Sequence, residues 1–115
     1  MNVVVVHGTL SGEPEVRVLA SGLEVLSWDV STSVEGGGTH SVPVRWESPS
    51  ASVKSCAKGA EVMVLGVVRR RFFRAGGATQ TRVEVLADAF ANPRRAAAVA
   101  RLRTKADERL LAGAT

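Results

Sequence analysis

Six consecutive residues near the middle of the chain combine cations with aromatic rings. They are Arg69, Arg70, Arg71, Phe72, Phe73 and Arg74. Guanidinium groups pair with phosphates, and flat aromatic side chains offer faces on which flat rings stack. This basic-aromatic segment, residues 69–74, therefore indicates a nucleic-acid footprint. A solvated hairpin tip is the alternative interpretation.

The residues before this segment predict the strand that carries it. Residues 62–68 are apolar on both faces of an extended chain, apart from Gly66. This pattern predicts a strand buried on both sides or lying at the closing seam of a barrel. A glycine inside such a strand predicts a bulge or a sharp bend. Gly76-Gly77 is a turn signal and residues 79–90 are again strand-like, so the sequence predicts one long hairpin with the basic-aromatic segment at its tip.

The chain has 115 residues, which is the size of one domain. Its one cysteine, Cys56, cannot form an internal disulfide, and we expect a buried, unreactive thiol. The apolar run at residues 3–6 is too short for a signal peptide or a membrane span. We therefore expect a cytoplasmic protein with no membrane partner.

Charge is unevenly distributed along the chain. Residues 1–92 contain nine basic and nine acidic residues, whereas residues 93–115 contain six basic residues against two acidic ones. A nucleic-acid contact in the neutral part must therefore arise from local clustering, and residues 69–74 are the strongest cluster.

Three strand-like runs precede the hairpin, at residues 2–10 with a short continuation at 16–18, at 23–34 and at 39–47. Trp28 alternates in step with apolar neighbours, so we expect it in the core. Pro43 cannot donate to a ladder, so it predicts an edge position or a bulge in the third run. Ser48 or Ser50 can cap a short helix over residues 51–57, and Gly59 can end that helix.

The last part of the chain has a helical pattern. Asn92-Pro93 is a helix-start signal, and residues 94–112 carry a thin apolar stripe beside many basic residues. The order of elements, with a short helix between the third and fourth strands, predicts an all-β, five-stranded OB-fold Greek-key barrel. We assign residues 1–91 to this barrel and residues 92–115 to a basic C-terminal helical extension.

An ordered series of short motifs runs through residues 2–91. They are Asn-Val-Val-Val-Val-His-Gly-Thr-Leu (2–10), Glu-Pro-Glu-Val-Arg (13–17), Ser-Gly (21–22), Trp-Asp-Val-Ser-Thr-Ser (28–33), Lys-Gly-Ala-Glu-Val (58–62), Gly-Val-Val-Arg (66–69) and Glu-Val-Leu-Ala (84–87). In this order they resemble the bacterial single-stranded DNA-binding protein family. The resemblance implies sequence-independent binding of single-stranded DNA in replication, repair or recombination, without a cofactor.

The resemblance also implies roles for individual side chains. Trp46 and Phe73 stand at positions where the family has rings that stack on bases, and His40 stands where a ring often opens the third strand. We expect Arg69 and Arg71 to share the face of Phe73 and to neutralise phosphates. The secondary phosphate candidates are Arg17, Arg45 and Arg74. Core packing is the alternative role for Trp46, and we expect Phe72, on the opposite face, to be in the core.

Three features depart from the family pattern. The loop at residues 35–39 is short and lacks a ring, tyrosine is absent, and a basic helix stands in place of an acidic tip. We therefore expect a specialised paralogue that does not recruit partners through an acidic tail. The resemblance further implies a homotetramer or homodimer joined through first-strand edges at residues 2–6.

An OB barrel that has lost DNA binding and acts as a structural or oligomerisation module is the main alternative. An enzyme is not expected, because no nucleophile–base pair or pair of carboxylates stands out. A metal site is not expected either, since His7, His40 and Cys56 are the only imidazole and thiol ligands.

Overall fold

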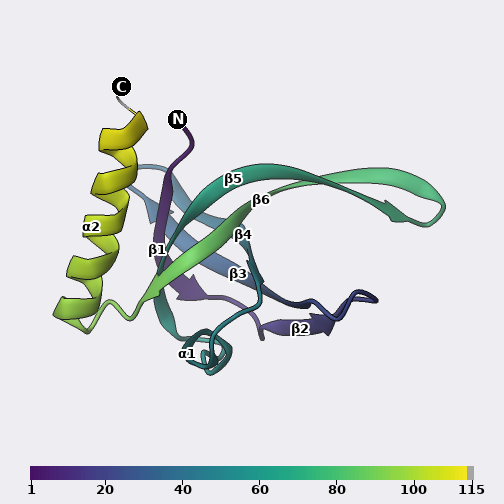
Figure 1. Cartoon of the computed structure of the whole chain (residues 1–115), viewed down its shortest axis with the longest axis horizontal. Helices are drawn as coiled ribbons and strands as arrows, with labels where there is room; N and C mark the ends of the chain where they lie inside the picture. Colours follow the sequence, from purple (N-terminus) through teal and green to yellow (C-terminus); the bar gives the residue numbers. More distant parts are fainter. Residues whose placement is uncertain (114–115) are drawn as a thin grey trace.

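The computed structural model describes residues 1–113. Along these residues the elements are β1 (Val4–Leu10), β2 (Glu15–Val18), β3 (Glu24–Val34), β4 (Gly38–Glu47), α1 (Ala51–Lys54), β5 (Glu61–Ala75), β6 (Ala78–Ala91) and α2 (Ala96–Gly113). Figure 1 shows the strands curling around one another, with α2 standing beside them and α1 below.

Five strands close into a barrel. They pair in the order β1-β5-β6-β4-β3, and β3 closes the ring by pairing with the end of β1 at Thr9↔Ser31 and Leu10↔Val30. The predicted five-stranded OB-type barrel, with a short helix between its third and fourth strands, is therefore confirmed. The expectation that residues 16–18 continue β1 is wrong. These residues lie in a separate strand, β2, which among residues 1–113 pairs only with β3.

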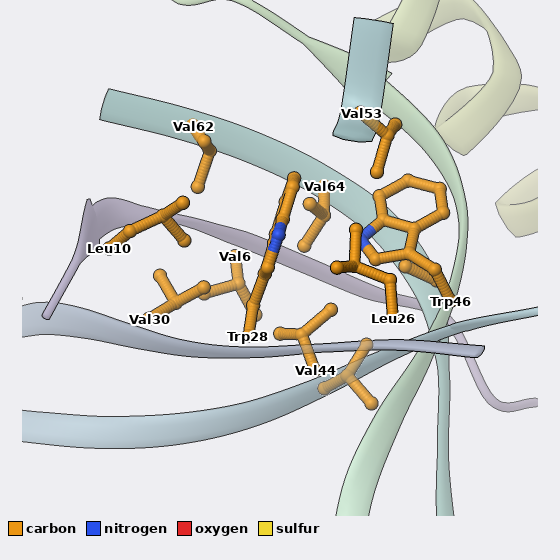
Figure 2. Packing of buried hydrophobic residues seen from close by; sticks show 12 residues of the cluster. Val6, Leu10, Leu26, Trp28, Val30, Val44, Trp46, Val53, Val62 and Val64 are labelled. Carbon is orange, nitrogen blue, oxygen red and sulfur yellow. The ribbon is translucent and has the colours of Figure 1, made fainter. Parts of the chain in front are cut away.

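The barrel core follows the two-residue alternation of its strands. Its buried side chains are Val6, Leu10, Leu26, Trp28, Val30, Val44, Trp46, Val53, Val62, Val64, Val85 and Ala87. Figure 2 shows both indoles inside this cluster. Trp28 is 2% exposed and meets Trp46 edge to face, with the ring centroids 5.5 Å apart. The prediction that Trp28 belongs to the core is confirmed.

Two special residues mark irregular points of the barrel. The β5–β6 ladder shifts register between Leu65 and Gly66, which confirms the predicted irregularity at that glycine. A Cβ on Gly66 would collide with the carbonyl of Leu86, so the two backbones approach too closely for any other residue. Pro43 pairs with Asp29 of β3, while the pairing of β4 with β6 starts only at the next residue. Pro43 thus lies where β4 is still an edge, as predicted.

The short helix differs from its expected bounds. Ser50 is the cap, and its Oγ accepts the Val53 amide at 3.3 Å. The helix ends at Lys54 rather than near residue 57. Gly59 has φ +92° and lies in the following turn, where its amide donates to the Leu10 carbonyl, so it does not end the helix. That turn joins α1 to β5.

Helix α2 packs on the outside of the barrel. Leu102 and Ala106 are buried against Leu65 of β5 and Ala91 of β6, which makes a second, smaller core. Arg109 adds a two-pronged ion pair with Asp88, at 2.7 and 3.0 Å. No helix of residues 1–113 is long and apolar enough to cross a membrane.

The β5–β6 hairpin continues well beyond the barrel. Its two strands pair from Met63↔Ala91 to Ala75↔Ala78, but β1 pairs with β5 only up to Gly66 and β4 pairs with β6 only from Val85 onward. Residues 68–84 therefore form a two-stranded ribbon that reaches out from the barrel, as Figure 1 shows. Gly76 and Gly77 both have positive φ and close its tip, which confirms the predicted turn.

Candidate nucleic-acid interface

The ribbon has two faces that differ in composition and burial. Side chains alternate along a strand, so Arg69, Arg71 and Phe73 share one face, opposite Glu84, Arg82 and Gln80 of β6. Arg69, Arg71 and Phe73 are half-buried. We call the surface made by these six residues the arginine face. The expectation that Arg69 and Arg71 lie on the same face as Phe73 is confirmed.

The opposite face of the ribbon carries the remaining residues of the basic-aromatic segment. Arg70, Phe72 and Arg74 are exposed there. Phe72 is 66% exposed, so the expectation that it packs in the core is wrong. Phe72 would be buried only if another layer of the protein covered its face of the strand. This part of the hairpin lies outside the barrel, so no other part of residues 1–113 covers that face. Arg74 donates to the Gly77 carbonyl at 3.0 Å and so braces the turn.

A buried carboxylate lies at the base of the arginine face. Glu84 is 4% exposed and accepts hydrogen bonds from the Nε and Nη2 atoms of Arg69, both at 3.2 Å. Its two oxygens also accept from Nε of Arg71, at 3.1 and 3.3 Å. Charge-assisted bonds of this kind are about twice as strong as neutral ones. Glu84 therefore holds two arginines side by side.

Arg71 also connects the buried carboxylate to an aromatic ring. Its guanidinium carbon lies 5.0 Å from the centroid of Phe73, within the range of a cation–π contact. One side of the Phe73 ring is therefore covered by a cation. An arginine stacked on a ring creates a flat surface that combines positive charge with a π face, which suits the stacking of a nucleobase beside its phosphate.

A third arginine approaches the same cluster from the barrel. Arg45 of β4 is registered with Leu86 of β6, two residues from Glu84. Burial lowers the pKa of Arg45, and the positive charge of Arg71 lowers it further. Its Nε atom is buried and has no hydrogen-bond partner within residues 1–113. Arg45 thus lies close enough to Arg69, Arg71 and Glu84 for their charges to act on it.

A cavity of about 310 Å³ opens between the ribbon and the β2–β3 side of the sheet. Its cationic lining consists of Arg17, Arg45, Arg71 and Arg82. Three carboxylates, from Glu13, Glu15 and Asp29, also line it. Asp29 pairs with Arg82 at 3.6 Å, so Arg82 is already partly neutralised. Arg17 is exposed on β2 and joins this wall, so the structure brings it near Arg45 and Arg71.

The structure does not place the other two predicted rings on this surface. Trp46 is 5% exposed and packs against Trp28, so it offers no face to a base, and its expected role as a stacking platform is wrong. Alternation explains the burial, because Trp46 is in step with the buried Val44. His40 is exposed at the start of β4, and its ring nitrogen lies 3.1 Å from the Gly37 carbonyl. It is five residues from Arg45, or about 16 Å along the strand, and points to the other side of β4.

Sequence reasoning missed Glu84. A signal for it was present, since a two-residue turn at Gly76-Gly77 fixes the pairing of the hairpin. Counting back from that turn places residue 69 opposite residue 84, as the structure does. The acidic residue would then have been found beside the arginines.

No group of three or more His, Cys, Asp or Glu side chains that could hold a metal ion occurs among residues 1–113. Cys56 is partly buried, and burial raises the pKa of its thiol. A scan of protein-family models finds no match to this chain, and a search of curated proteins finds none either.

Proposed function

We propose that this protein binds single-stranded DNA without sequence preference and without catalysis, using the arginine face of the β5–β6 ribbon. The observation that carries the proposal is the stack of Arg71 on Phe73 beside two further arginines and a single buried carboxylate. Phosphates would be neutralised by Arg45, Arg69 and Arg71, and one base would stack on the free side of Phe73. Replication, repair or recombination in the cytoplasm would be the setting.

Unpaired strands suit this surface better than duplexes for a geometric reason. A ring that projects from a narrow ribbon can reach a base only if the base is unstacked from its neighbours, as in a single strand. None of the side chains on the arginine face needs to recognise a base edge. Binding is therefore expected to depend on salt and on strandedness rather than on sequence.

The direct test is a titration of fluorescently labelled oligo-dT followed by anisotropy. Both tryptophans are buried, so a change in intrinsic fluorescence would be a poor reporter. Neutralisation of about three phosphates predicts a slope of log affinity against log salt near −2, at about −0.7 per phosphate. Binding that is absent at low salt, or that shows no salt dependence, would contradict the proposal.

A second candidate function has its own observation. Within residues 1–113, the edge of β1 away from β5 has no strand partner from Val4 to Gly8, because β3 pairs with β1 only at Thr9 and Leu10. Val5 on this strand is 48% exposed. An open, valine-rich edge favours association with a second copy, as a homodimer or homotetramer. A structural or oligomerisation module without DNA binding would rely on this edge alone.

Light scattering on the purified protein separates the two candidates. If Val5→Lys converts an oligomer to a monomer that still binds oligo-dT, the edge serves assembly and the ribbon serves DNA. If the parent protein is an oligomer that does not bind oligo-dT, the structural module is the better account.

A further inference from the structure

The arrangement of hydrogen bonds around Glu84 leaves particular donors free. Both bonds from Arg71 to Glu84 leave from its Nε atom. Its two terminal Nη groups make no hydrogen bond within residues 1–113. Arg69 uses Nε and Nη2 on the same carboxylate and keeps Nη1. The carboxylate therefore occupies only part of each guanidinium group, and Nη1 of Arg69 and both Nη groups of Arg71 keep donors for a ligand.

Arg45 supplies a further unsatisfied donor in the same place. Its Nε is buried without a partner in the described part of the chain, although a buried N–H normally has one. The charges of Arg71 and Arg69 disfavour its charged form, whereas those of Glu84 and Glu47 favour it. The carboxylates of Glu13, Glu15 and Asp29 line the cavity that Arg45 shares with Arg71, but none of them bonds the buried Arg45 Nε within residues 1–113, so an anionic ligand would satisfy this donor.

Glu84 also offsets the mutual repulsion and the conformational freedom of the arginines. Three guanidinium groups of like charge repel one another, and each long side chain has many rotamers to lose on ordering. A carboxylate that is itself buried in the β6 ladder cannot move away, so it holds Arg69 and Arg71 in one arrangement before any ligand arrives. A ligand then binds without the cost of ordering them.

We propose that Glu84 is a positioning residue, which orients Arg69 and Arg71 so that they form, with Arg45, a defined subsite for one phosphodiester group. The subsite rests on the proposed function, because it takes the phosphate of the nucleotide whose base stacks on Phe73. It adds a negative side chain to the binding machinery, and it makes the site one of fixed geometry rather than diffuse positive charge.

A positioning role for Glu84 and a purely electrostatic role predict opposite changes in oligo-dT affinity for the same substitution. Glu84→Gln removes a negative charge beside the phosphate, so a site that works by charge alone would bind oligo-dT more tightly. If Glu84 positions the arginines, the same substitution loosens Arg69 and Arg71 and weakens binding. Arg71→Lys provides an independent version of the test, because lysine keeps the charge but lacks Nε and the flat guanidinium.

The experiment compares four proteins by oligo-dT anisotropy: the parent, Glu84→Gln, Arg71→Lys and the control Arg70→Lys. Arg70 is on the opposite face of the same strand. We expect Glu84→Gln and Arg71→Lys each to weaken binding by about five- to tenfold, while Arg70→Lys leaves it unchanged. Unchanged or tighter binding by Glu84→Gln would overturn the proposal. If Glu84→Gln fails to fold in a melting experiment, equal affinities of Arg71→Lys and Arg70→Lys would overturn it instead.

A probe without bases separates this inference from the proposed function. Tripolyphosphate presents phosphates but nothing to stack on Phe73, and its binding is read as a rise in melting temperature. Stabilisation of the parent, lost in Arg71→Lys but kept in Arg70→Lys, supports the subsite even if oligo-dT does not bind. If the parent binds oligo-dT but tripolyphosphate raises the melting temperatures of the parent, Arg71→Lys and Arg70→Lys equally, the subsite proposal is overturned. The proposed function would then remain intact.

Discussion

Replacing Phe73 with leucine isolates the stacking contribution of the ribbon. Leucine keeps an apolar side chain of similar size but has no ring face. One side of the Phe73 ring is covered by Arg71 at 5.0 Å, so a single base can stack on the other side. Stacking of one base on an aromatic side chain contributes about 1–3 kcal/mol, so Phe73→Leu should weaken oligo-dT binding by about 5- to 150-fold.

The control for this prediction is the same substitution at the neighbouring phenylalanine, which lies on the opposite face of the ribbon. Phe72→Leu removes the adjacent ring from the same strand, and that ring is the more exposed of the two. We expect this control to bind like the parent. Neither residue belongs to a buried core, so both proteins should keep the parent melting temperature. Equal affinities for Phe73→Leu and the parent, or a larger loss in Phe72→Leu, would refute the reasoning.

Three further predictions concern the scaffold. Trp46→Phe should lower the free energy of unfolding in urea by about 1–3 kcal/mol, because Trp46 packs in the core. The folded variant should bind oligo-dT with the parent affinity. A loss of affinity without a loss of stability would instead indicate that Trp46 stacks on a base. Gly66→Ala should lower the free energy of unfolding in urea by about 1–3 kcal/mol, because its methyl group would collide with the Leu86 carbonyl. Parent stability would show that β5 and β6 leave room for a Cβ at this position. Leu102→Ala should cost about 2–5 kcal/mol in the same assay and leave affinity unchanged; lower affinity at parent stability would place α2 in the interface.

The barrel could be predicted because local signals agreed with one another. Gly66 marked the irregular point of the β5–β6 ladder, Gly76-Gly77 marked the hairpin turn and Pro43 marked the edge of β4, and each residue has a backbone requirement that sequence reveals directly. The short helix between the third and fourth strands then fixed the order of the barrel. The one topological error, the separate strand β2, arose because four exposed residues carry no burial pattern.

The candidate site was harder to predict, for three different reasons. Trp46 was assigned to the surface by analogy with a family position, although its alternation with Val44 already favoured the core. Phe72 was assigned to the core by alternation, which holds only while another layer covers the strand. Where a hairpin leaves the barrel, both faces meet solvent and alternation no longer reports burial. The role of Glu84 depends on pairing across the hairpin, which emerges only when the register is counted.

The most direct test of the central claim, that the arginine face of the ribbon holds the phosphates, is the salt dependence of oligo-dT affinity in two matched variants. Arg71→Gln and Arg70→Gln remove the same charge from adjacent positions on opposite faces. Between about 50 and 200 mM salt, Arg71→Gln should reduce the steepness of the slope by about 0.7, the contribution of one phosphate, and Arg70→Gln should leave the parent slope. Equal slopes for the two variants, or a larger reduction in Arg70→Gln, would contradict the claim.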